Sequence, residues 1–162
     1  MALFDAFLKI DGIEGESADS KHKGEIDLHS FSWGESNAGT FATGGGGGAG
    51  KVAMQDLHFT MKINKASPKL FLACASGEHI KKATLTCRKA GKDQQEFLKL
   101  DLSDILISSY QTGGSSGGSE VPMDQISLNF AKIEVGYKEQ KADGTLGGEV
   151  KAGWDVKANK KV

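Results

Sequence analysis

Apolar and polar side chains alternate one by one along most of this chain, and this alternation restricts the fold more than any other feature of the sequence. Between residues 57 and 63, for example, Leu57, Phe59 and Met61 are separated by polar side chains. A period of two residues is typical of β-strands that bury one face. The chain contains about seven to nine such segments between turn signals. We therefore predict a mainly β fold, either a small β-barrel or a two-sheet sandwich.

Two of the predicted strands change their apolar face partway along. Ile26 and Leu28 hold one phase of the alternation. The bulky Phe31 and Trp33 that follow hold the other, and residues 126–137 change phase in the same way. Such a change predicts a β-bulge or two differently buried faces. Because one core cannot cover both faces, the remaining apolar surface is what a subunit interface needs.

Further strands and one short helix complete the predicted fold. The strands cover residues 4–10, 52–63, 83–88 and 150–156, and residues 97–102 and 105–110 form either two strands or one bent strand. The helix is expected at about residues 68–76, flanking the β structure. Ser67 is a favoured N-cap, Pro68 fits the first helical position, and Gly77 is typical of the position that ends a helix.

Length and charge fit a single domain that spans residues 1–162. A chain of about this length buries roughly 68–70% of its unfolded surface without disulfides or a structural metal. The formal net charge of −1 argues against a nucleic-acid partner, because such proteins carry an excess of basic residues. Residues 1–50 hold 3 lysines and 8 acidic residues, whereas residues 51–162 are net basic. This asymmetry reflects either chance variation of the surface or complementary faces for head-to-tail self-association.

The N-terminus and the cysteines bear on the cellular compartment. Residues 1–10 contain Asp5 and Lys9 and have no long apolar run, so we expect neither a signal peptide nor a membrane span there. Synthesis and folding are expected in the cytoplasm, and any export must use a route that needs no N-terminal leader. Cys74 and Cys87 both occupy apolar positions, so we expect two buried free thiols.

A glycine-rich run between two predicted strands nearly matches a phosphate-binding loop. It consists of Gly44, Gly45, Gly46, Gly47, Gly48, Ala49, Gly50 and Lys51. Gly45, Gly50 and Lys51 have the spacing of a P-loop, but Val52 stands where Ser or Thr holds the magnesium ion. A strand follows instead of a helix, so no helix N-terminus is available for an anion. We therefore expect a loop between two strands and no nucleotide cofactor. The alternative is a nucleotide-binding enzyme, and in that case ATP would raise the melting temperature of the protein.

No motif in the sequence predicts a catalytic or metal site. The four histidines have no metal-ligand spacing, and we expect them at the surface or half-buried; they are His22, His29, His58 and His79. Asp101 and Asp104 fit a strand bend better than an acid–base pair. A loose group of basic residues is expected to form a solvated edge; it comprises Lys81, Lys82, Arg88, Lys89 and Lys92. Trp33 and Trp154 are expected to be core or interface anchors.

A set of short sequence words runs in a fixed order through nearly the whole chain. It includes Phe7-Leu8-Lys9-Ile10, Gly15-Glu16-Ser17, Ser32-Trp33-Gly34, Gln55-Asp56-Leu57, Ala73-Cys74-Ala75-Ser76-Gly77, Arg88-Lys89-Ala90-Gly91, Leu128-Asn129-Phe130-Ala131, Gln140-Lys141-Ala142-Asp143-Gly144 and Gly153-Trp154. In this order and at this spacing, the words resemble the Hcp proteins of type VI secretion systems. With no extension after Val162, we expect a plain structural member of that family and not one fused to a toxin domain.

The resemblance implies a β-barrel of two sheets with one flanking helix, and it implies no catalytic activity and no cofactor. It implies homohexameric rings that stack into the inner tube of a contractile, phage-tail-like machine. That tube lies inside sheath proteins and beneath a spike of the VgrG type. It is cytoplasmic before firing, is then secreted without an N-terminal signal peptide, and carries small effector or toxin proteins in its lumen. The alternative is a secreted chaperone or carrier ring for effectors that acts without long tubes.

Two sites follow from the same resemblance. The glycine-rich run from Gly44 to Lys51 is expected to extend from one ring toward the next and to act as a ring-stacking loop. Ser32, in the word before Trp33 and Gly34, is expected to face the lumen and to contact effectors.

Overall fold

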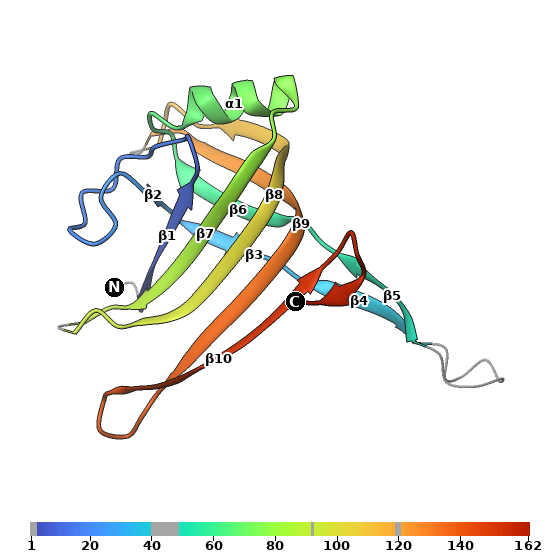
Figure 1. Ribbon diagram of the computed structural model, residues 1–162. Helices are drawn as coiled ribbons and strands as arrows, with labels where there is room; N and C mark the ends of the chain where they lie inside the picture. The colour runs from blue at the N-terminus through green and yellow to red at the C-terminus, as the bar shows by residue number, and fades with distance from the viewer. Residues whose placement is uncertain (1–2, 40–48, 92, 119–120) are drawn as a thin grey trace.

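Antiparallel strands form a barrel around one buried core (Figure 1), in which each strand pairs with the next except at the corner between β2 (Ile26–Asp27) and β3 (Ser30–Ser32). The structure is a computed structural model that describes residues 3–39, 49–91, 93–118 and 121–162. The barrel runs through β1 (Phe4–Ile10), β7 (Ile80–Lys89), β8 (Glu96–Gly113), β9 (Met123–Gln140), β6 (Leu57–Lys62), β3 and β2, which pairs with β1 again. The predicted mainly β fold is confirmed in its barrel form.

The barrel closes at the corner between β2 and β3. The N–H group of Leu28 donates to the carbonyl of Ala6 on β1 at 2.9 Å, and the N–H group of His29 donates to Thr60 on β6 at 2.8 Å. The chain therefore leaves one neighbouring strand and joins another within two residues. This corner is the physical reason for the change of phase between Ile26 and Phe31 in the sequence, and no β-bulge is needed to explain it.

The strand predicted over residues 52–63 is two strands in two different sheets. Among the residues that the structure describes, β5 (Ala49–Met54) pairs only with β4 (Glu35–Gly39), whereas β6 pairs with β3 and β9. The chain breaks at Gln55 and Asp56, where the N–H group of Gln55 donates to the carbonyl of Gly34 at 2.9 Å. The β4–β5 hairpin extends away from the barrel (Figure 1), and β4 is exposed along its whole length. The prediction of one continuous strand was therefore wrong.

Beyond the barrel, β9 changes its neighbour. Its first part pairs with β6, and residues 132–140 pair with β10 (Leu146–Asp155), which in turn pairs with β11 (Lys160–Lys161). We call the outer parts of β9 and β10 the β9–β10 wing. The wing leaves the barrel, so the two halves of β9 bury different faces, as the sequence predicts for residues 126–137. β8 is one bent strand, and Asp104 adopts a positive φ of 54° within it.

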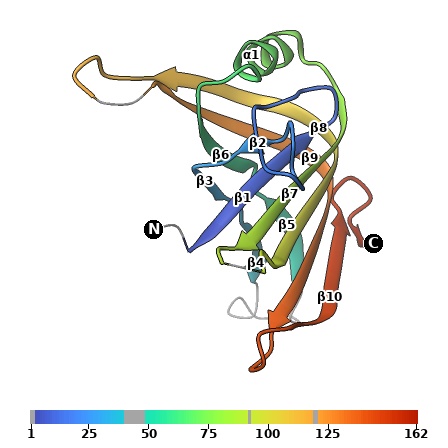
Figure 2. The same cartoon turned by 90° about the vertical axis from the view of Figure 1, so that its left-hand side faces the viewer.

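The helix α1 (Ser67–Ser76) lies across one end of the barrel (Figures 1 and 2). Its buried residues include Leu70 and Ala73, which pack into the core. Gly77 ends the helix in the left-handed conformation with φ of 68°, as predicted. The predicted N-cap is wrong, because Ala66 occupies that position and Ser67 is the first helical residue, which places Pro68 at the second helical position and not at the first. The Ser67 hydroxyl donates instead to the buried carboxylate of Asp124 at 2.5 Å, which ties the helix to β9.

A buried arginine fixes the loop of residues 11–25 to the barrel. Arg88 on β7 is only 3% exposed and donates to both carboxylate oxygens of Asp19 at 2.7 and 3.0 Å. It also donates to Asp5 at 3.2 Å, and its guanidinium lies 4.8 Å from the centre of the Phe7 ring. The predicted solvated edge is confirmed for the exposed Lys81, Lys82 and Lys89 and is wrong for Arg88; Lys92 lies outside the described residues.

His22 belongs to the same cluster and is buried, against expectation. Its ring stacks on Phe7 with the centres 4.3 Å apart. Its Nδ1 lies 2.8 Å from Glu25 and its Nε2 lies 2.7 Å from Glu96 on β8. The polar sequence around His22 suggested a solvated loop, but the loop folds back and covers Phe7. The expected exposure is confirmed for His29, His58 and His79.

Candidate functional site

Eight uncharged or weakly basic polar side chains form two parallel rows on one face of the barrel. The register of β3, β6, β9 and β8 places one residue of each strand in each row. The first row is Ser32, His58, Ser127 and Ser109, and the second row is Ser30, Thr60, Gln125 and Gln111. We call these eight residues the polar face. Their apolar neighbours along the strands, such as Phe59 and Ile126, point into the core, so the face follows directly from the two-residue period.

Some side chains of the polar face form hydrogen bonds with one another. The Ser109 hydroxyl donates to Ser127 Oγ at 2.7 Å, and Ser127 Oγ lies 2.6 Å from His58 Nδ1. The hydroxyls of Ser30 and Thr60 bond to each other at 2.5 Å. These bonds hold the side chains of four neighbouring strands in fixed positions.

Other groups of the polar face have no partner within the described part of the chain. They are the Ser32 hydroxyl, the His58 Nε2 atom and the side-chain amides of Gln111 and Gln125, which all lie on exposed residues. The face lines an open depression of about 430 Å³. At one end of the face, Asp56 already accepts hydrogen bonds from Ser108 at 2.6 Å and Asn129 at 2.8 Å. The described residues that line the depression include no Asp, Glu, Lys or Arg, so it offers mainly neutral donors and acceptors to a ligand.

The two sites expected from the sequence lie in different parts of the structure. Ser32 is exposed at the end of the first row of the polar face. In the glycine-rich run, Ala49, Gly50 and Lys51 belong to β5, and Gly44 to Gly48 lie outside the described residues. The strand expected after Lys51 is present, so this lysine does not begin a helix. The other seven residues of the polar face were missed, because only the pairing of distant strands brings them together.

An apolar groove lies between the β4–β5 hairpin and the β9–β10 wing. Trp33 and Met54 line one side of it, and Ile133, Val135 and Trp154 line the other, around a volume of about 230 Å³. The indole nitrogens of Trp33 and Trp154 are buried and have no hydrogen-bond partner among the described residues. An unpaired buried donor costs roughly 1–3 kcal/mol. The two unpaired indole groups therefore indicate that the groove lacks a partner surface in an isolated chain.

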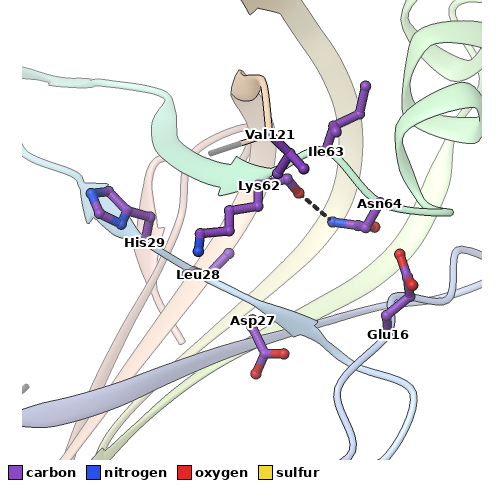
Figure 3. Close-up of a pocket in the computed structure, with 8 residues that line it drawn as sticks. All are labelled: Glu16, Asp27, Leu28, His29, Lys62, Ile63, Asn64 and Val121. Carbon is purple, nitrogen blue, oxygen red and sulfur yellow. Dashed lines mark hydrogen bonds between the residues drawn. The ribbon is translucent and has the colours of Figure 1, made fainter. Parts of the chain in front are cut away.

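A second depression of about 440 Å³ lies beside the barrel corner (Figure 3). It contains the charged residues Glu16, Asp27 and Lys62, but Figure 3 shows the side chains of Asp27 and His29 turned away from the Lys62 amine. Glu16 accepts a hydrogen bond from the Lys65 backbone at 2.9 Å, and burial raises the pKa of Asp27 above its ordinary value. The charged groups of this depression do not converge on one point.

The cysteines and the acidic residues of β8 lie where they support the fold and do not form a site. Cys87 is buried, and burial raises the pKa of its thiol to about 11, whereas Cys74 is half-buried and not fully buried as expected. Within the described ranges, no cluster of His, Cys, Asp or Glu side chains is arranged to hold a metal ion. None of the helices described is long and apolar enough to cross a membrane. Asp101 accepts a hydrogen bond from Thr84 at 2.8 Å, and Asp104 occupies the bend of β8, as predicted.

Comparisons with known proteins identify the family of this chain. Residues 7–137 match the family model described as type VI secretion system effector, Hcp. Protein hcp1 of Pseudomonas aeruginosa is 50% identical over 157 residues, which is 96% of each chain. The crystal structure of Hcp1 from Salmonella typhimurium has 37% identity and a TM-score of 0.82, covering 99% of this chain and 100% of that one. A structure of a type six secretion system protein has 33% identity and a TM-score of 0.94, covering 98% and 99%. The chain therefore belongs to the Hcp family, the non-enzymatic tube and effector proteins that type VI secretion systems secrete.

Proposed function

We propose that six copies of this chain, each a single Hcp-like barrel domain over residues 1–162, form a closed ring, and that rings stack into the inner tube of the secretion machine. The apolar groove carries the proposal. A ring needs one surface that fits a different surface of the next copy, repeated by rotation. A groove with two tryptophan anchors and apolar walls suits such a contact, because buried aromatic residues dominate interface energies.

Electron microscopy of the purified protein tests this proposal. We expect closed rings at low concentration and stacks of rings at high concentration, because contacts between polar ring faces are weaker than contacts within a ring. Single particles of one chain would contradict the ring. Rings that never stack, even at high concentration, would favour the alternative of a carrier ring for effectors that acts without long tubes.

We infer that the glycine-rich run from Gly44 to Lys51 contacts the neighbouring ring. The β4–β5 hairpin supports this role, since it extends away from the barrel and its strand β5 contains Ala49, Gly50 and Lys51 of the run (Figure 1). Replacing Gly45, Gly46 and Gly47 with tyrosine is expected to shorten the stacks and to leave hexamers intact, because bulky side chains remove the conformational freedom of the loop. Stack length by electron microscopy and particle mass by sedimentation measure the two effects.

The matched control replaces the same three glycines with serine, which keeps the side chains small. We expect this variant to stack nearly as well as the wild type. A tyrosine variant that loses the hexamer would show that the loop acts within one ring, and a variant with normal stacks would show that the loop is not a stacking contact.

We infer that the polar face, with Ser32 at its end, lines the lumen and contacts effectors. Ser32 is exposed and has no partner within the described residues, and it borders the 430 Å³ depression. The Ser32→Leu variant is expected to form rings but to lose small proteins that co-purify with the wild type, because the larger apolar side chain fills part of the depression. Mass spectrometry of the purified rings measures the loss.

Ser76→Leu serves as the control, since Ser76 is exposed at the end of α1, away from the polar face. This variant should retain the co-purified proteins. Retention by Ser32→Leu as well would place the effector contacts elsewhere.

The further partners follow from family membership and remain part of the proposal. They are sheath proteins around the tube, a spike protein of the VgrG type above it, and small effector or toxin proteins inside it. The chain is expected in the cytoplasm before firing and outside the cell afterwards.

A further inference from the structure

The helix α1 is apolar on the side that faces away from the barrel as well as on the side that faces the core. Its outer side carries a stripe with the spacing i, i+3, i+4 and i+7, which consists of Pro68, Phe71, Leu72 and Ala75. We call these four residues the helix stripe. Phe71 makes an edge contact with the Tyr110 ring but remains 58% exposed, and Leu72 is 61% exposed. A helix that is apolar on all sides is ordinarily buried on all sides, so the helix stripe lacks a covering surface in the described part of one chain.

Lys69 carries the only charge of α1, and it lies three positions before Leu72 on the helix surface. Its amine forms no hydrogen bond or ion pair within the described ranges. The acidic residues that border the same depression have other partners. Glu14 pairs with Lys65 at 3.7 Å. The Glu25 carboxylate lies 2.8 Å from the His22 ring. The helix stripe therefore presents apolar surface with one unpaired positive charge beside it.

The apolar groove between the β4–β5 hairpin and the β9–β10 wing has the complementary chemistry. Trp33, Met54 and Trp154 supply apolar walls, and Glu35 is the only charged residue among the described residues that line it. Glu35 is exposed and has no ion pair or hydrogen bond in the described part of the chain. Apolar grooves commonly bind a helix through side chains at positions i, i+3, i+4 and i+7, which is the spacing of the helix stripe.

The helix stripe and the groove cannot meet within one copy of the chain. α1 lies across one end of the barrel, whereas the hairpin and the wing extend away from its other end (Figures 1 and 2). A contact between them joins two different surfaces of two copies, which is the kind of contact that a ring repeats by rotation. Glu35 also belongs to the acidic first part of the chain and Lys69 to its basic remainder, as complementary faces for head-to-tail association require.

We propose that the helix stripe of one copy packs into the apolar groove of the next copy, with Lys69 beside Glu35 of that neighbour. Phe71 and Leu72 supply the apolar contact, and the charge pair sets the direction of the helix in the groove. The inference rests on the proposed ring, and it names the surface that fills the groove at each contact.

Sedimentation equilibrium of Leu72→Glu at micromolar concentration tests the role of the helix stripe. Full burial of a leucine side chain changes affinity about 10- to 100-fold, and the new carboxylate also lies on the side of Glu35. We expect single folded chains where the wild type gives rings. Val121→Glu is the matched control and should keep its rings. Val121 is 51% exposed and lines the depression of Figure 3, outside α1.

Two charge reversals identify the surface that the helix contacts. An exposed ion pair changes affinity by up to about fivefold, and a reversal replaces its attraction with repulsion at every contact of the ring. We expect Lys69→Glu and Glu35→Lys each to raise the concentration at which rings dissociate by about fivefold or more at low salt. The variant that combines both reversals should dissociate at nearly the same concentration as the wild type, because the pair is restored with opposite signs.

Recovery of assembly in the combined variant would support the pairing of α1 with the groove. Intact rings in Leu72→Glu, or a combined variant that assembles no better than the single reversals, would overturn the inference. The ring would then still be judged by Trp154→Glu, which changes the groove whatever surface fills it. Single chains in the wild type would overturn the ring and the inference with it.

Discussion

Replacing Trp154 with glutamate is expected to convert rings into single folded chains. Trp154 lines the apolar groove opposite Trp33, and it belongs to the β9–β10 wing, outside the barrel. A carboxylate in this groove has no cationic partner among the lining residues, and Glu35 adds a second negative charge there. Loss of a buried tryptophan at an interface typically costs about 2–4 kcal/mol per contact, and a closed ring repeats the contact at every subunit. Sedimentation velocity measures the loss of the ring.

Val150→Glu is the matched control for this prediction. Val150 lies on the same strand β10 and is 73% exposed, and it does not line the groove. This variant should remain assembled. Circular dichroism should show folded β structure in both variants, since neither residue belongs to the buried core. Intact rings in Trp154→Glu would show that the groove is not a ring contact.

Replacing Arg88 with methionine is expected to lower the free energy of unfolding by about 2–3 kcal/mol. Methionine fills the buried space, but it leaves Asp19 and Asp5 without their common partner and removes the cation beside the Phe7 ring. Breaking a fully buried ion pair costs about 3–5 kcal/mol, and the cost is smaller here because Asp5 can turn toward water. Urea denaturation measures the change. Lys151→Met, which breaks the exposed pair with Glu134 at 3.3 Å, should have little effect.

The contacts of Arg88 also predict how pH affects the difference in the free energy of unfolding between wild type and Arg88→Met. The hydrogen bond from Arg88, together with the Lys21 N–H group, holds the pKa of Asp19 well below its ordinary value. A carboxyl whose pKa is lower in the folded state stabilises the fold above the pKa of the unfolded chain, about 3.9, and this stabilisation is lost as the pH falls. The gap in stability between wild type and Arg88→Met should therefore narrow below about pH 4. A gap that is constant with pH would show that the loss comes from packing alone.

The local elements of the fold could be predicted because they depend on local chemistry. The alternation of Phe4 to Ile10 predicts β1, and Pro68 with Gly77 predicts the helix α1. The sequence also contains a signal for the break between β5 and β6, which the prediction of one continuous strand overlooked. The apolar residues before the break lie at even positions, such as Val52 and Met54, and those after it lie at odd positions.

The burial of Arg88 and His22 could not be read from the sequence. Both residues stand among charged neighbours, which ordinarily indicates a solvated surface. Their burial depends on a loop that folds back over β1 and brings Asp19 to Arg88 across 69 positions of sequence. Periodicity within one strand carries no information about such a contact.

The grouping of residues in the polar face could likewise not be predicted from the periodicity of single strands. Alternation predicts that His58 and Thr60 point away from the core, but it does not say which strands lie beside β6. The register with β3 and β9 places Ser32 and Ser127 on either side of His58. Ser32 could be named in advance only through the family resemblance, whereas its neighbours in the face required the paired strands.

The mass of the purified protein in dilute solution tests the central claim most directly. Sedimentation equilibrium at micromolar concentration should give the mass of six chains, because the ring contact buries the apolar groove whereas stacking depends on weaker contacts between rings. A mass of six chains that persists on dilution would agree with the closed ring. The mass of one chain, 17.1 kDa, at the same concentration would contradict it.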